Sequence, residues 1–196
     1  RVAKLFEGVS GRNRFLEARD GIRAQMGIRD KFIQGMHRQV KYLDKLLEIF
    51  KAEGVPVEIL ALPHVESSFN PHARSHVGAA GMWQFMRSTG RRYLRINRRQ
   101  DQRLDPYLSS RAAARHLKYS YERLGSWPLA IMAYNHGTAG IMRAKRAVNS
   151  SDHVEIIKRY SSRTFQFASR NFYPEFIAAL EVSIAPWAYF PLDELP

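Results

Sequence analysis

The chain has 196 residues, 45% of them hydrophobic and 12% aromatic, so it is long enough to bury a core and too apolar to be a disordered basic tail. It has no cysteine, which excludes disulfides, thiolate zinc sites and a cysteine nucleophile. The net charge of +13 favours a polyanionic partner, such as nucleic acid, an anionic lipid surface or an acidic wall polymer, and no stretch reaches the ~18 apolar residues of a membrane-spanning helix.

Helical patterns dominate the first half of the chain. Apolar residues recur every three or four positions over 30–52 and predict one amphipathic helix there. Gly54 ends this helix, because glycine adopts the left-handed conformation that closes many helices. Pro56 then begins a short apolar segment over 57–66, which Pro63 kinks or limits.

Turn and capping residues divide the rest of the chain into further helices. Asn70 and Pro71 open a glycine-containing loop, while Asp105 caps and Pro106 starts a helix that Gly125 ends. One or two short helices are expected around Gly90 over 83–94, and further helices at 127–135, 141–148, 153–160 and 167–184. Since no alternating strand pattern occurs, the sequence predicts an all-α fold.

One isolated acid stands out, because the stretch from His64 to Met86 contains only Glu66. Glu66 would lie in the last turn of an apolar helix, where the helix dipole and partial burial both favour the neutral carboxyl group. A general acid for glycosidic cleavage needs such a raised pKa near neutral pH. The alternative is an ordinary surface glutamate near a helix end.

Glycosidases usually carry a second carboxylate across the scissile bond, and none lies near Glu66 in the sequence. Four acids could approach it through folding, although each also fits a helix cap or a solvated charge: Asp101, Asp105, Asp152 and Glu155. Without a second carboxylate, the nucleophile must be an ordered water or a hydroxyl group of the substrate itself.

The run "ALPHVESSFNPHARSHVGAAGMWQFMRSTG", 61–90, is followed by "AYNHG" at 133–137. Together they resemble the soluble lytic transglycosylase (SLT) domain of family 23 glycosidases, which is akin to goose-type lysozyme, and within it the membrane-bound transglycosylase D group. The resemblance covers about 55–185. It implies a lysozyme-like (goose-type) helical catalytic domain at 55–190, preceded by an N-terminal helical extension, 1–54, that packs on the core.

The resemblance also implies an activity, that of a peptidoglycan lyase acting between N-acetylmuramic acid and N-acetylglucosamine. Glu66 would protonate the linking oxygen and then act as base on the muramyl C6 hydroxyl, which closes onto C1 as a 1,6-anhydro ring. The family's substrate-binding residues fall on Ser75, Gln84, Met86, Tyr134 and Asn135. No cofactor and no metal are implied.

The same resemblance places the protein in the periplasm or cell envelope, with peptidoglycan glycan strands and other cell-wall proteins as partners. Because the sequence begins with Arg1, we expect an upstream segment with an export signal, and any membrane anchor would lie outside these residues. Two rival functions remain on the same fold: a muramidase-type hydrolase, in which water replaces the C6 hydroxyl, and a non-catalytic peptidoglycan-binding domain.

The late family motif "ETxxYV" departs most from the pattern, since it reads "ASRNFYPEF" at 168–176. Its acid is replaced by Ala168, and its tyrosine falls on Phe172 or is displaced to Tyr173. This change puts the far wall of the cleft in question and motivates the non-catalytic alternative.

Small and aromatic residues of the main motif could also contact a sugar. Gly78 and Gly81 would let the backbone approach a sugar closely. Trp83 and Phe85 would either offer ring faces to a pyranose or pack in the core.

Two further constellations point to other chemistries. The histidines His64, His72 and His76 suggest a metal site, but no HExxH pattern accompanies them and we expect none. A run of arginines fits a solvated surface or a nucleic-acid contact, and consists of Arg87, Arg91, Arg92, Arg95, Arg98, Arg99 and Arg103. No nucleic-acid-binding motif accompanies the run. Under the lyase activity that the resemblance implies, it would attract the stem-peptide carboxylates of peptidoglycan.

Overall fold

The computed structural model describes residues 29–196, and its compact unit spans Lys31–Pro196. Residues 1–28 of the predicted extension lie outside the described part. The helices are α2 (Arg29–Val40), α3 (Leu43–Glu53), η2 (Val57–Ala61), α4 (Leu62–Ser67), α5 (Arg87–Gly90), η3 (Gln102–Leu104), α6 (Pro106–Leu124), α7 (Trp127–His136), α8 (Thr138–Val148), α9 (His153–Arg159), α10 (Phe167–Ile184), η4 (Pro186–Ala188) and η5 (Leu192–Glu194). Within residues 29–196 only isolated β-bridges occur, so the all-α prediction is confirmed.

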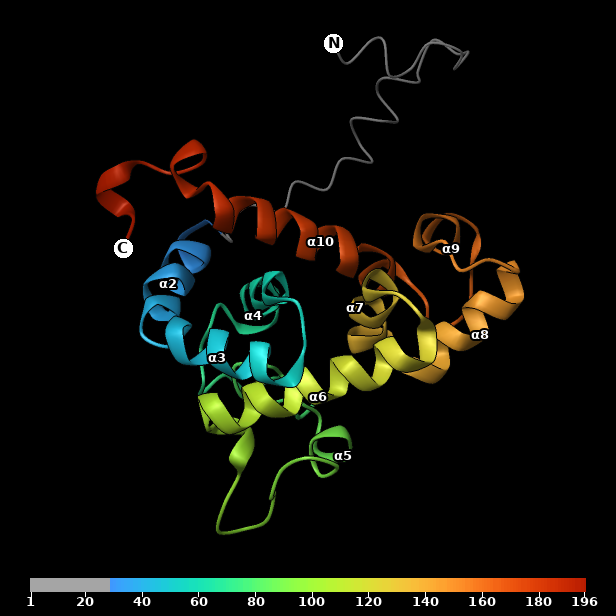
Figure 1. Ribbon diagram of the computed structural model, residues 1–196, viewed down its shortest axis with the longest axis horizontal. Helices are drawn as coiled ribbons and strands as arrows, with labels where there is room; N and C mark the ends of the chain where they lie inside the picture. Colours follow the sequence, from blue (N-terminus) through green and yellow to red (C-terminus); the bar gives the residue numbers. More distant parts are fainter. Residues whose placement is uncertain (1–28) are drawn as a thin grey trace. The chain divides into compact units, whose positions relative to one another are not determined.

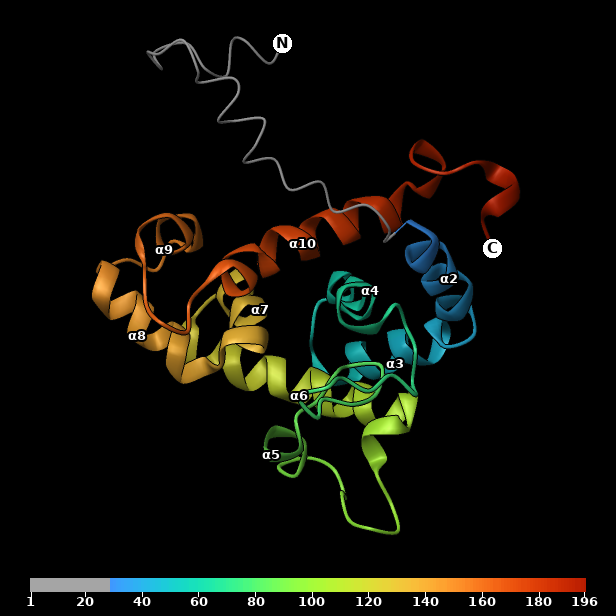
Figure 2. The same ribbon diagram turned by 180° about the vertical axis from the view of Figure 1, so that it is seen from behind.

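The short helix α4 occupies the centre of the unit. Figures 1 and 2 show it between α10 on one side and α3 and α6 on the other. Leu62 of α4 is fully buried, as is Phe69 just after it, and both belong to the main hydrophobic core. A second apolar cluster joins α7, α8 and α9 at the other end of α6. The short helix α4 therefore packs in the main core among the longer helices α3, α6 and α10.

The single helix predicted over 30–52 is wrong, because a turn at Lys41 and Tyr42 separates α2 from α3. Val40, which belongs to the predicted apolar stripe, is 60% exposed. Tyr42 instead packs edge-on against Tyr107 of α6, with ring centroids 6.2 Å apart. After the break, α3 packs against α6 and buries Leu46, Ile49 and Phe50.

Local capping signals locate other helix ends well. The carboxylate of Asp105 accepts hydrogen bonds from the backbone N–H of Tyr107 and Leu108, and Gly125 closes α6 with a φ of 83°. Of the one or two short helices expected around Gly90, the structure has α5, while Trp83 lies in a turn and is buried. Within the described residues, no helix is long and apolar enough to cross a bilayer.

Candidate active site

Glu66 lies in the last turn of α4 and is partly buried. Among the residues that the structure describes, its carboxyl group forms no ion pair and accepts no hydrogen bond. Burial, with a smaller contribution from the negative charge of Glu175 on α10, raises the pKa of Glu66 from 4.5 to about 8. The group is therefore protonated at neutral pH, as a general acid must be.

The backbone just after Glu66 is held in an uncommon conformation. Ser68 and Phe69 follow it with φ values of 52° and 57°, in the left-handed region that disfavours side chains larger than glycine. Burial of the Phe69 ring and a hydrogen bond from Arg38 Nη1 to the Ser68 carbonyl, 3.0 Å, hold this turn in place. The sharp end of α4 thereby fixes the direction of the glutamate.

The end of α4 is joined to the glycine-containing loop. Ser67 Oγ donates a hydrogen bond to the carbonyl of Met82 at 2.7 Å and accepts one from the backbone N–H of Asn70 at 3.2 Å. The Ser67 hydroxyl thus joins the end of α4 to Asn70 at the start of the loop and to Met82 farther along it.

Arg103 is 1% exposed and stabilises the same loop by hydrogen bonds. Its Nη1 donates to the carbonyls of Gly78 and Phe85, both at 2.8 Å, and its Nε and Nη2 donate to the Asp101 carboxylate. Hydrogen bonds from Arg103 lower the pKa of Asp101. The expectation that the whole arginine run is solvated is therefore wrong for Arg103, which is a buried clamp.

Gly81 packs against the backbone of Arg103, so the space beside it is not open to a sugar. Its φ is 84°, and a Cβ there would lie 1.8 Å from the backbone oxygen of Arg103. Gly78, by contrast, has open space where a Cβ would lie.

The two aromatic residues of the loop are buried. Trp83 is 0% exposed, donates from Nε1 to Ser110 Oγ at 2.7 Å and stacks on Phe50 with centroids 5.5 Å apart. Stacking of Trp83 on a pyranose is therefore excluded, and the core-packing alternative is correct. Phe85 is 3% exposed, yet it contributes to the wall of a pocket.

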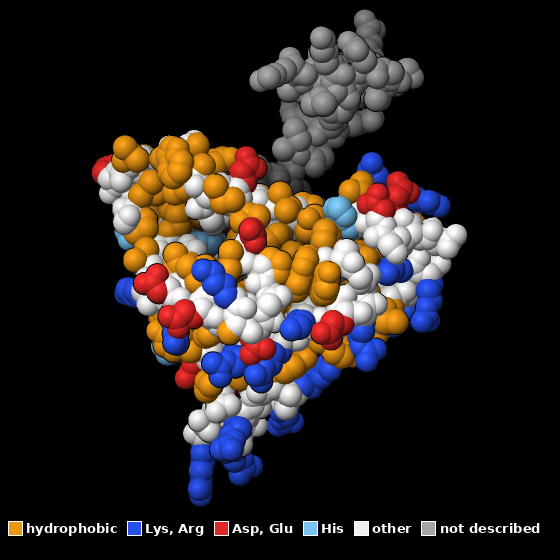
Figure 3. Space-filling model, in the orientation of Figure 1, with side chains coloured by type: hydrophobic (Ala, Val, Ile, Leu, Met, Phe, Trp, Pro, Cys, Tyr) orange, Lys and Arg blue, Asp and Glu red, His pale blue; other side chains and the backbone are white. Residues whose placement is uncertain are grey.

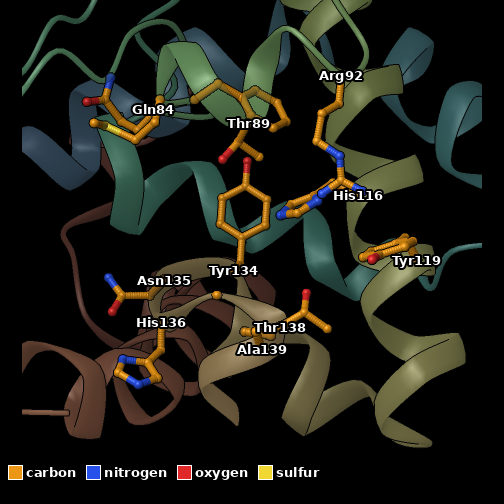
Figure 4. Close-up of a pocket in the computed structure, with 14 residues that line it drawn as sticks. Gln84, Thr89, Arg92, His116, Tyr119, Tyr134, Asn135, His136, Thr138 and Ala139 are labelled. Atoms are coloured by element: carbon orange, nitrogen blue, oxygen red, sulfur yellow. The ribbon is translucent and has the colours of Figure 1, made fainter. Parts of the chain in front are cut away.

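That pocket has a volume of about 450 Å³ and brings together two distant segments of the chain. Gln84 and Met86 line it from the loop, while Tyr134 and Asn135 line it from the end of α7 (Figure 4). Met86 is 42% exposed, and Gln84 is held at a φ of 46° with its amide donating to the Gly81 carbonyl. Four of the predicted substrate-binding residues thus share one pocket.

Ser75 is placed differently. Its Oγ accepts a hydrogen bond from the backbone N–H of Ala79 at 3.0 Å, and it is not among the residues that line the pocket. It stabilises the turn of the loop.

Tyr134 connects the pocket to the glutamate. Its ring stands in the middle of Figure 4, and its hydroxyl donates to the Trp83 carbonyl at 2.9 Å. Burial, together with the charge of Glu66, raises the pKa of Tyr134 well above its ordinary value. The charge of Glu66 therefore acts on Tyr134, a residue of the pocket wall, although Glu66 itself is not one of the lining residues.

The altered late motif supports the pocket through α10. Ser169 Oγ donates to Asn135 Oδ1 at 3.0 Å and lies 3.2 Å from Nδ1 of His136. Phe172 is buried in the core, and Tyr173 packs edge-on against His153 with centroids 4.8 Å apart. Ser169 of the altered motif thus holds the amide group of Asn135, which lines the pocket.

The acid that approaches Glu66 was missed by the sequence analysis. The four acids considered there are engaged elsewhere: Asp101 with Arg103, Asp105 and Asp152 as helix caps, and Glu155 with Arg159. Glu175 is exposed on α10, seven residues beyond Ala168 and hence on the same helical face. That two-turn spacing from the altered motif position is the only signal that could have indicated it.

The three histidines considered for a metal occupy different environments. His64 is buried, stacks on Phe32 at 4.2 Å and has Nε2 3.1 Å from Gln39 Oε1, while His72 and His76 are exposed. Burial lowers the pKa of His64 to about 4. Within residues 29–196 no group of three potential ligands is arranged to hold a metal ion.

The sequence is similar to a known protein family and to proteins within and outside its named activity. Residues 47–157 match the family model described as the transglycosylase SLT domain. Over 96 residues, 48% of this chain and 21% of the relative, the sequence is 42% identical to the membrane-bound lytic murein transglycosylase D of Escherichia coli K12. Over 131 residues, 66% of this chain and 63% of the relative, it is 30% identical to a putative tributyltin chloride resistance protein of Alteromonas sp. M-1.

Among solved structures, the 70 kDa soluble lytic transglycosylase of Escherichia coli superimposes with a TM-score of 0.61 at 20% identity, over 79% of this chain and 26% of that chain. This likeness establishes the lysozyme-like helical fold. The chain spans less than two thirds of the length of each of these three proteins. Because the family model covers more than half of its residues, and the fold agrees, the chain belongs to the transglycosylase SLT domain family.

Proposed function

We propose that this chain is the catalytic part of a peptidoglycan lytic transglycosylase acting in the periplasm or cell envelope, with the activity carried by residues 55–190. The observation that carries the proposal is Glu66, a protonated and partly buried acid that has no ion-pair partner within residues 29–196. Its charge acts on Tyr134, which lines the pocket together with other motif residues of the family. The names of the lytic transglycosylase relatives support peptidoglycan as the substrate.

In the proposed reaction, Glu66 donates its proton to the oxygen that links N-acetylmuramic acid to N-acetylglucosamine, and the C1–O bond breaks. The resulting carboxylate stabilises the positive charge that develops at C1. It then takes the proton of the muramyl C6 hydroxyl, whose oxygen bonds to C1 and closes the 1,6-anhydro ring. Glu66 ends protonated as it began, and no water is consumed. The substrate's own hydroxyl makes a second catalytic carboxylate unnecessary.

The pocket residues would orient the sugars. Gln84 and Asn135 offer amide groups to acetamido and hydroxyl groups, and Met86 offers an exposed apolar surface. Tyr134 would support Glu66 from the pocket floor, while Ser75 would keep the loop in shape.

Digestion of purified sacculi tests the proposal. We expect soluble muropeptides whose mass is one water lower than that of hydrolysis products, measured by mass spectrometry. Products at the full hydrolytic mass would identify a muramidase instead. Saturable binding without soluble products would identify a non-catalytic binding domain.

The pH dependence follows from the raised pKa of Glu66. Because the protonated form is required, kcat/KM should fall as pH rises through about 8. Glu175→Gln removes the nearby negative charge, lowers the pKa of Glu66 and should move this fall to lower pH. Complete pH profiles of kcat/KM measure the shift.

The matched control is Glu122→Gln, which removes an exposed acid from α6. Its profile should overlay that of the unaltered protein. If Glu175→Gln also left the profile unchanged, the influence of Glu175 on Glu66 would be disproved.

A further inference from the structure

One end of the pocket is built from an arginine and aromatic rings. In Figure 4, Arg92, His116 and Tyr119 lie together on the side of Tyr134 opposite Gln84. The Arg92 guanidinium lies 4.7 Å from the centroid of the Tyr119 ring and 5.6 Å from that of Tyr93. The family motifs identified in the sequence include neither Arg92 nor Tyr119.

The Arg92 guanidinium is held in place but has no polar partner. In the described part of the chain it forms no ion pair and donates no hydrogen bond, and its residue is exposed. A guanidinium stacked by its face on a ring keeps its N–H edge available for the two oxygens of a carboxylate. The stacking therefore orients a donor pair in advance of binding.

The positive charge at this end is reinforced and not neutralised. Arg123 places a second guanidinium 4.5 Å from the centroid of Tyr119, and it too lacks an ion pair within residues 29–196. His116 adds no charge, because burial and the charge of Arg92 lower its pKa to about 4. A carboxylate arriving here would meet two uncompensated cations.

Arg92 differs from the other members of its sequence run. Arg103 is buried with all of its polar partners in place, whereas Arg87, Arg91 and Arg95 are exposed and do not line the pocket. Lys and Arg side chains gather at the lower edge of the molecule, over the loop after α5 (Figure 3). Of the residues that line this pocket, only Arg92 is an arginine or lysine.

We propose that Arg92, stacked on Tyr119, binds a carboxylate of the peptidoglycan strand at the end of the pocket. This rests on the proposed function, because the glycan strand is the substrate assumed there. The carboxylate has two sources: the free carboxyl groups of the attached peptides, or the lactyl carboxylate of a muramyl residue without a peptide. Both present the same planar, bidentate group to the guanidinium.

Three soluble substrates separate the sources: peptide-bearing strands, the same strands with their carboxyl groups amidated, and strands freed of peptides by an amidase. If peptide carboxylates are bound, Arg92→Gln lowers kcat/KM on peptide-bearing strands by about 10- to 100-fold. On amidated strands, the unaltered protein then falls to the level of the variant. If the lactyl group is bound, the loss appears on peptide-free strands and amidation of peptide-bearing strands has no effect.

The control is Arg163→Gln, which removes the same charge from an exposed arginine outside both the pocket lining and the arginine run. It should change none of these values. The subsite is disproved if Arg92→Gln has no effect on any substrate, or reduces kcat/KM equally on all three.

Binding provides a measurement that does not depend on turnover. In a Glu66→Gln background, Arg92→Gln should raise the Kd for the recognised strand by a similar factor, and added salt should reduce the difference. Tyr119→Phe keeps the ring and should bind as before, whereas Tyr119→Leu should weaken binding about 2- to 10-fold. An absence of cleavage by the unaltered protein would disprove the proposed function alone, because these Kd ratios would still test the subsite.

Discussion

Glu66→Gln is expected to slow the release of muropeptides from sacculi by about two to four orders of magnitude, because a glutamine cannot donate or accept the catalytic proton. The amide has nearly the same shape, so α4 and the pocket should remain folded. Muropeptide release is followed by chromatography, and circular dichroism checks the fold. Turnover at the unaltered rate in this variant would remove Glu66 from the mechanism.

Glu58→Gln is the matched control, since Glu58 is an exposed acid of η2 just upstream of α4. Its rate should equal that of the unaltered protein. A loss as large as that of Glu66→Gln would show that the assay responds to general damage near α4.

Stability against pH provides an independent test of the same residue. The folded state keeps the Glu66 proton up to about pH 8, whereas the unfolded chain loses it near 4.5. The folded state therefore binds more protons in this window, and the free energy of unfolding falls as pH rises through it. Glu66→Gln should remove this contribution, so its stability relative to the unaltered protein should increase from pH 5 to pH 8 in urea titrations.

Arg103→Met is expected to lower the free energy of unfolding by about 3–5 kcal/mol, because it removes one partner of a buried ion pair. Methionine fills much of the same volume, but the Gly78 carbonyl loses its side-chain donor. The Asp101 carboxylate keeps only the backbone N–H of residue 103 as a hydrogen-bond donor, and the Phe85 carbonyl keeps only that of Ala80. Urea denaturation at neutral pH measures the loss. Because the clamp holds the loop that carries Gln84, activity should decline even where the variant is fully folded.

Arg98→Met is the control for Arg103, since Arg98 is an exposed arginine of the same sequence run. Its effect should stay within about 0.5 kcal/mol, as for most surface substitutions. If both substitutions cost under 1 kcal/mol, the buried hydrogen bonds of Arg103 would not hold the loop together.

Much of this molecule could be predicted from local sequence. The start and end of α6 follow from Asp105, Pro106 and Gly125, whose capping preferences act over a single turn. The bounds of α10, Phe167–Ile184, agree with the predicted 167–184. The position of Glu66 in the last turn of α4 follows from the same kind of short-range pattern.

Tertiary structure alone decided which residues meet across the fold. Arg103 resembles its solvated neighbours in sequence but is buried, and Trp83 resembles a sugar platform but packs on Phe50. The influence of Glu175 on Glu66, and the stacking of Arg92 on Tyr119, join residues that are far apart in the sequence. Periodicity and capping report only the faces and ends of one element, whereas burial and charge interaction depend on which elements pack together and at what separation.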